Sequence, residues 1–218
     1  MKETVLFSNV IDDITADVCD CSFNQNTISA LKKTQSKKQN LIFINAPGFK
    51  NDNLYFKRLI SCFDKIGIHF DNMIELSDSN QHSKLKSFPK ENRVYFLMGG
   101  NPITQMDIIK KYNLLDILKD YEGLVIGFCA GAINLSKYSI ITSDNDFATP
   151  SSYSGINRID ITIEPHYTED DSEFTLNRKK ELNTFCKELG TNIIALPDTS
   201  AIYVADSMIE ILGNIYKF

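Results

Sequence analysis

Short apolar runs alternate with longer amphipathic stretches along this chain, and that alternation constrains its fold more than any other feature of the sequence. An apolar run of four or five residues fits a buried strand, and apolar residues every three or four positions fit a helix. The predicted strands are Thr4–Phe7, Leu41–Asn45, Val94–Met98, Leu124–Gly127 and Ile193–Leu196. The predicted helices are Thr27–Lys38, Asn53–Ile66, Ile103–Tyr112, Ala130–Lys137 and Thr175–Leu189. Their alternation predicts a three-layer αβα sandwich around one mostly parallel sheet.

The last part of the chain has a different pattern. Ala201–Val204 and Met208–Leu212 are close together, which predicts an antiparallel hairpin at the edge of the sheet. The polar stretch Asp144–Asn157 contains Pro150 and Gly155 and predicts a surface loop. Because the sequence has no linker-like segment, we expect residues 1–218 to form a single domain.

Charge and composition exclude several classes of function. The chain has 23 Lys and Arg against 28 Asp and Glu, a net charge of −5, so we expect no nucleic-acid partner. No apolar run reaches the roughly 18 residues of a membrane span, so we expect no membrane partner. Five scattered cysteines without a CxxC pair predict a reduced, cytoplasmic protein. Cys19 and Cys21 lack further ligands, and we predict no metal site.

The segment Gly127-Phe128-Cys129-Ala130-Gly131-Ala132 follows a predicted strand and opens a predicted helix. This G-x-C-x-G pattern is typical of a nucleophile elbow, in which glycines allow a sharp turn that raises one side chain above the sheet. A helix N-terminus favours a thiolate at Cys129. The alternative interpretation is that Cys129 is a small buried apolar residue.

A nucleophile of this kind needs a base and a group that orients the base. His69 and His82 precede the elbow, and only His166 follows it, after a predicted strand at Ile159–Ile163. For the orienting acid we favour Asp198, which comes just after Ile193–Leu196. Glu164 and Asp160 remain alternatives.

Gly99-Gly100-Asn101-Pro102 lies between a predicted strand and a predicted helix, with Asn101 placed to cap that helix. In an acyl-transfer enzyme, the N–H of Gly99 or Gly100 and the N–H of Ala130 would form an oxyanion hole. A plain capped turn explains the same glycines.

The order of nucleophile, histidine and acid differs from that of α/β-hydrolases and is expected of the class I glutamine-amidotransferase-like, flavodoxin-like fold. In that context the sequence resembles the dipeptidase E (peptidase E) family, which includes cyanophycinases. The resemblance rests on Gly99-Gly100-Asn101, Gly127-Phe128-Cys129-Ala130-Gly131-Ala132, Glu164-Pro165-His166-Tyr167 and Leu196-Pro197-Asp198.

The resemblance implies a hydrolase of small peptides with Cys129, His166 and Asp198 as its catalytic residues. We expect the protein to be a monomer or homodimer. The resemblance implies no cofactor or metal, and it makes Asn101 and Arg178 candidate substrate-binding residues. The sequence departs from the family at Cys129, where the family has serine. It also departs at the start of the helix after the histidine loop, where an arginine that recognises an amino-terminal aspartate is expected and Thr175-Leu176-Asn177 stands instead.

Two other functions use the same residues. A glutamine amidase that feeds ammonia to a partner would share the cysteine, the histidine and the acid. A non-catalytic redox or ligand-binding module would use Cys129 as a reactive thiol.

Overall fold

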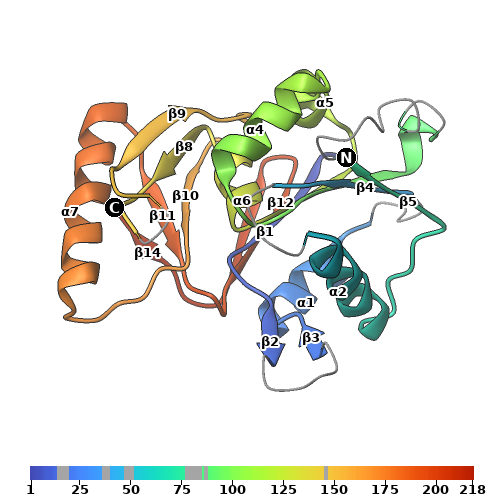
Figure 1. The fold of residues 1–218 in the computed structure, drawn as a ribbon, viewed down its shortest axis with the longest axis horizontal. Helices are drawn as coiled ribbons and strands as arrows, with labels where there is room; N and C mark the ends of the chain where they lie inside the picture. Colours follow the sequence, from blue (N-terminus) through green and yellow to red (C-terminus); the bar gives the residue numbers. More distant parts are fainter. Residues whose placement is uncertain (14–19, 36–39, 47–51, 77–84, 86–87, 145–146) are drawn as a thin grey trace.

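The computed structural model describes all residues except 14–19, 36–39, 47–51, 77–84, 86–87 and 145–146. Its central sheet has seven strands in the order β13-β12-β1-β7-β6-β4-β5 (Figure 1). They are β1 (Glu3–Phe7), β4 (Asn40–Ile44), β5 (Asn72–Leu76), β6 (Arg93–Leu97), β7 (Leu124–Phe128), β12 (Ala201–Ala205) and β13 (Met208–Leu212). Five of these strands, β1, β7, β6, β4 and β5, are parallel to one another. β12 pairs antiparallel with β1, and β13 pairs antiparallel with β12. The predicted mostly parallel sheet and the C-terminal hairpin are confirmed.

Helices cover both faces of this sheet (Figure 1). The helices of one face are α1 (Gln25–Lys33) and α2 (Asp52–Lys65), and those of the other are α4 (Pro102–Lys111), α5 (Leu115–Asp120) and α6 (Ala130–Leu135). Successive side chains of a strand point to opposite faces, so Val5 and Phe7 pack with α1 and α2, and Leu6 packs with the other helices. This arrangement is the predicted three-layer sandwich.

A second, smaller sheet corrects one part of the prediction. Ile193–Leu196 is a strand as predicted (β11), but it lies outside the central sheet. It pairs in parallel with β10 (Thr162–Pro165) and antiparallel with β14 (Tyr216–Lys217), and α7 (Glu173–Leu189) packs against this sheet. The apolar sequence of β11 would suit a strand of the central sheet as well as one of the small sheet. What distinguishes them is pairing with distant residues, such as that of Ile193 with Phe218, which the sequence of β11 does not reveal.

The predicted surface loop is also partly wrong. Within Asp144–Asn157, residues Ser151–Ser154 form β9, which pairs antiparallel with β8 (Tyr138–Ile141). Three of the four residues of β9 are exposed and only Tyr153 packs on the core, so the segment has no apolar run. A further short pair joins β2 (Ile11–Asp13) to β3 (Asp20–Ser22), and η1 (Lys90–Asn92) precedes β6. Among the described residues, no helix combines the length and apolarity needed to cross a bilayer.

A buried arginine ties the segment before β10 to the start of the central sheet. Arg158 is 4% exposed, and burial lowers its pKa to about 10. Its guanidinium donates to Thr4 Oγ1 and to the carbonyl oxygens of Glu3, Leu118, Tyr121 and Gly123, at 2.7–3.1 Å. The planar, five-donor fork of arginine suits such a cluster of acceptors.

Replacing Arg158 by alanine should therefore lower the free energy of unfolding by about 3–5 kcal/mol, because several buried carbonyls lose a charged donor. Urea unfolding followed by circular dichroism measures the change. Lys137→Ala is the control, because it breaks only the exposed pair with Asp160 and should change stability far less than Arg158→Ala does. Equal losses in the two variants would contradict this role for Arg158.

Candidate active site

The predicted site residues gather at the carboxyl ends of strands from both sheets, where open α/β sheets commonly bind ligands. Gly99 and Gly100 follow β6, Cys129 follows β7, His166 follows β10, and Asp198 follows β11. The two sheets therefore contribute different members of one cluster.

Cys129 lies in the sharp turn between β7 and α6 that the glycine spacing predicts. Its backbone has φ 48° and ψ −107°, a conformation that L residues rarely adopt. The Cys129 N–H donates to Phe7 O at 3.0 Å, which ties the turn to β1. A β-carbon at Gly131 would lie 2.2 Å from Leu97 O, so the helix can approach β6 this closely only with glycine there.

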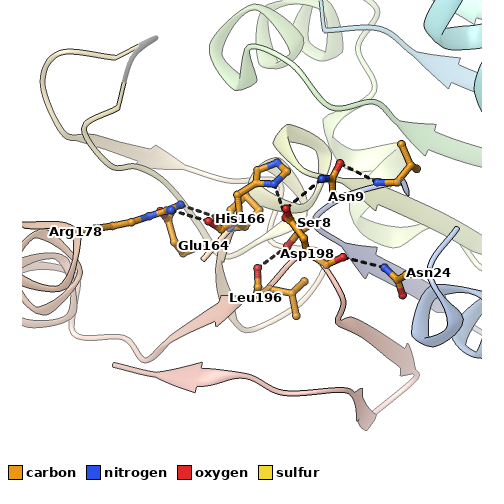
Figure 2. Close-up of polar contacts among 10 residues, drawn as sticks. Ser8, Asn9, Asn24, Glu164, His166, Arg178, Leu196 and Asp198 are labelled. Atoms are coloured by element: carbon orange, nitrogen blue, oxygen red, sulfur yellow. Dashed lines mark hydrogen bonds and ion pairs between the residues drawn. The ribbon is translucent and has the colours of Figure 1, made fainter. Parts of the chain in front are cut away.

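His166 and Asp198 contact each other directly (Figure 2). His166 Nδ1 lies 2.6 Å from Asp198 Oδ1, and the backbone of His166 also has a positive φ, of 53°. Asn9 Nδ2 donates to Asp198 Oδ2 at 3.1 Å, and Asn24 Nδ2 donates to the Asp198 carbonyl at 2.9 Å. The carboxylate is thus held by groups on both sides.

The two alternative acids have other partners. Asp160 pairs with Lys137 at 3.1 Å. Glu164 is buried, and its Oε1 accepts from Thr142 Oγ1 at 2.7 Å and from Arg178 Nε at 2.5 Å. Of the three candidates weighed from the sequence, the structure brings Asp198 to the Nδ1 of His166.

Electrostatics at this pair favour a charged imidazole. Burial lowers the pKa of His166, but the hydrogen bond to Asp198 and the interactions with the Cys129 side chain outweigh it and raise the pKa to about 10. Burial alone would raise the pKa of Asp198, and the hydrogen bond and charge of His166 instead hold it below its ordinary value. Since Nδ1 faces Asp198, Nε2 is the ring nitrogen left for the sulfur.

Arg178 lies beside this pair and binds the backbone at His166 (Figure 2). In addition to Glu164, its guanidinium donates to His166 O at 2.8 Å and to Pro165 O at 2.6 Å. The ion pair with Glu164 is nearly buried, with side-chain exposures of 11% and 2%. Burial raises the pKa of Glu164, and the charge of Arg178 opposes that rise.

A cavity of about 400 Å³ opens beside the sulfur. Cys129, His166 and Gly100 line it, and Gly100 has φ 133°. Ala130 is buried and is the first residue of α6, where a backbone N–H has no partner within its own helix. These two N–H groups are the oxyanion donors that we predict. A β-carbon at Gly99 would lie 3.0 Å from the Phe128 ring and 3.3 Å from Cys129 Cβ, so a larger residue would crowd the cysteine turn.

The remaining predicted residues have contacts of their own. The Asn101 side chain caps α4, accepting from Ile103 N and Thr104 N at 3.0 and 3.2 Å, as predicted, and its contact with substrate stays a prediction. His69 pairs with Asp64 at the surface. His82 and Cys19 lie outside the described residues.

Three residues of the site were not found from the sequence. Asn9 and Asn24 bind Asp198, and the buried hydroxyl of Ser8 donates to Leu196 O at 2.6 Å. The one available signal was that Ser8 and Asn9 directly follow a buried strand. A larger hollow of about 730 Å³, lined by α7 and β14 residues such as Cys186 and Lys217, contains none of the predicted catalytic residues.

The raised pKa of His166 predicts a specific dependence of stability on pH. Because the folded protein holds this proton more tightly than the unfolded chain, the stabilisation is complete below about pH 6.5 and is lost as pH rises through about 10. NMR titration of the His166 ring should show a protonated imidazole at neutral pH. Asp198→Asn should lower the midpoint, and a native midpoint near 6.5 would contradict the pairing.

Known proteins resemble this chain in sequence and in fold. A family model described as Peptidase family S51 matches residues 16–212. A protein named Peptidase E from Nostoc sp. (strain PCC 7120 / SAG 25.82 / UTEX 2576) is 27% identical over 175 residues, which cover 75% of this chain and 69% of the relative. The crystal structure of a candidate peptidase E from Listeria monocytogenes EGD-e has the same fold, with a TM-score of 0.65 and 18% identity over 97% of this chain and 98% of that one. This chain belongs to peptidase family S51 and is a hydrolase of the peptidase E type.

Proposed function

We propose that the protein hydrolyses small peptides through a covalent intermediate on Cys129, with His166 and Asp198 as its partners. The observation that carries this proposal is the convergence of the three residues: Asp198 bonds Nδ1 of His166, and the Cys129 side chain and His166 line one cavity. We also propose that the protein acts in the cytoplasm, as a monomer or homodimer.

The charge of the imidazole determines how the acyl-transfer step would proceed. The Cys129 thiolate attacks the scissile carbonyl, and the new oxyanion accepts hydrogen bonds from the N–H groups of Gly100 and Ala130. His166, protonated at Nε2, donates that proton to the leaving amine as the C–N bond breaks. The products of this step are a thioester on Cys129, a free amine and a neutral imidazole.

Hydrolysis of the thioester reverses the role of the histidine. Neutral His166 accepts a proton from a water molecule, and the resulting hydroxide attacks the thioester carbonyl. The tetrahedral intermediate collapses with loss of the thiolate, giving a carboxylic acid and restoring the imidazolium. Asp198 holds the ring in one tautomer and stabilises its positive charge in both steps.

Arg178 and Glu164 position the histidine in this mechanism. Arg178 anchors the carbonyl oxygens of Pro165 and His166, at the point where the backbone has its positive φ. Glu164 orients Arg178 and is itself held by Thr142. Because a shift of about 1 Å can cost about a hundredfold in rate, this support has a direct effect on turnover.

Cys129→Ala should lower kcat/KM for small peptides by at least about 10³-fold, because no nucleophile remains. Cys129→Ser should retain activity between that of the native enzyme and that of Cys129→Ala, since a hydroxyl can occupy the same turn. Cys186→Ala is the matched control, because this half-buried cysteine lies away from the cavity. A dipeptide-library assay, with glutamine as an added substrate, measures all three variants. Undiminished hydrolysis by Cys129→Ala would refute the mechanism.

Arg178→Lys should lower kcat about tenfold or more and change KM less than about threefold, since lysine cannot hold Glu164 and two carbonyls together. The midpoint of the His166 titration should move as well, which a purely structural role would not require. Lys179→Ala, which removes the neighbouring cation on α7 and its exposed pair with Glu169, should leave both quantities unchanged. An unaltered kcat in a folded Arg178→Lys variant would rule out the positioning role.

A further inference from the structure

We infer that the cavity beside Cys129 binds an uncharged, apolar side chain of the substrate and disfavours an acidic one. This inference rests on the proposed function, since it assigns a substrate class to the same site. Three features of the cavity support it: the hydrogen bonds that Arg178 already makes, the charges of the lining residues and the apolar side chains that form its walls.

Arg178, the arginine that lines the cavity, forms its hydrogen bonds within the protein. Recognition of an acidic side chain needs a guanidinium whose paired donors face the ligand. In this protein the donors of Arg178 face Glu164, Pro165 O and His166 O, at 2.5–2.8 Å. The Arg178 side chain is 11% exposed, so turning it toward a ligand would leave the buried Glu164 carboxylate without its ion pair.

The balance of charge also opposes an acidic ligand. Among the described residues that line the cavity, Arg178 is the only lysine or arginine, and Asp144 and Glu164 supply two carboxyl groups. The positive charge of His166 is directed at Asp198 and at Cys129. A substrate carboxylate would therefore enter a space that already holds two carboxyl groups and whose described cations are paired within the protein.

The walls of the cavity are largely apolar. Six of the lining residues are Pro102, Ile133, Ile140, Ile141, Phe147 and Phe174. Ile140 and Ile141 are buried residues of β8, and Phe174 is 49% exposed at the first turn of α7. An apolar side chain that displaces water from such walls gains about tenfold or more in affinity when fully buried.

Binding to the Cys129→Ala variant tests this inference independently of catalysis. Isothermal titration calorimetry with Leu-Leu, Asn-Leu, Asp-Leu and Lys-Leu compares ligands that differ only in the first side chain. We expect Leu-Leu to bind at least about tenfold more tightly than Asp-Leu, and Asn-Leu to bind more tightly than its acidic isostere. Tightest binding of Asp-Leu, tightest binding of Lys-Leu, or no binding of any dipeptide at millimolar concentration would each overturn the inference.

Phe174→Ala gives a second test that does not risk the core, because the residue is exposed. It should reduce the preference for Leu-Leu over Asn-Leu by about threefold or more, in binding and in kcat/KM. Leu176→Ala is the matched control, since Leu176 is 46% exposed on the same helix but does not line the cavity, and its preference should equal that of the native protein. An unchanged preference in Phe174→Ala would count against the assigned wall.

The two proposals can fail separately. If Leu-Leu binds best but the native protein hydrolyses no peptide, the substrate class stands and the covalent mechanism is wrong. If peptides are hydrolysed in a Cys129-dependent way with Asp-Leu preferred, the mechanism stands and the substrate class is wrong.

Discussion

The attachment of the small sheet to the central sheet is the constraint on which the site depends. The buried Ser8 hydroxyl, just after β1, donates to Leu196 O at the end of β11. The side chains of Asn9 and Asn24 donate hydrogen bonds to Asp198, which follows β11. Cys129 belongs to the central sheet, and His166 and Asp198 follow strands of the small one. The geometry of the candidate site therefore depends on the junction between the two sheets and on neither sheet alone.

The sequence predicts well those parts of the fold that are buried on both faces. Strands β1, β4, β6 and β7 are continuous apolar runs, and their limits were predicted within one residue. β5 was missed because only Ile74 and Leu76 of its five residues are buried, which leaves no such run. β9 was missed for the same reason. The sheet that β11 joins depends on partners distant in sequence, and no local pattern reveals them.

The residues of the candidate site also differ in how far local sequence predicts them. Cys129 was predicted from local chemistry, because strand, glycine spacing and helix all lie within a few residues. His166 and Asp198 were predicted by elimination and by resemblance to a family, and their catalytic roles remain predictions. The contacts of Asn24 with Asp198 and of Thr142 with Glu164 were out of reach, because each joins segments that no motif connects. Arg178 was noticed, but its carbonyl partners could come only from coordinates.

The position of β12 has a consequence for biosynthesis. β1 precedes β7 and β12 in the chain; it pairs on one side with β7, and its other edge is covered by Ala201–Ala205 of β12. Asp198 and the partner of Ser8 also belong to this late part of the chain. On the ribosome, the cysteine turn is thus made long before residues 196–205, so the triad that we propose would be complete, and active, only after this later segment has emerged and folded.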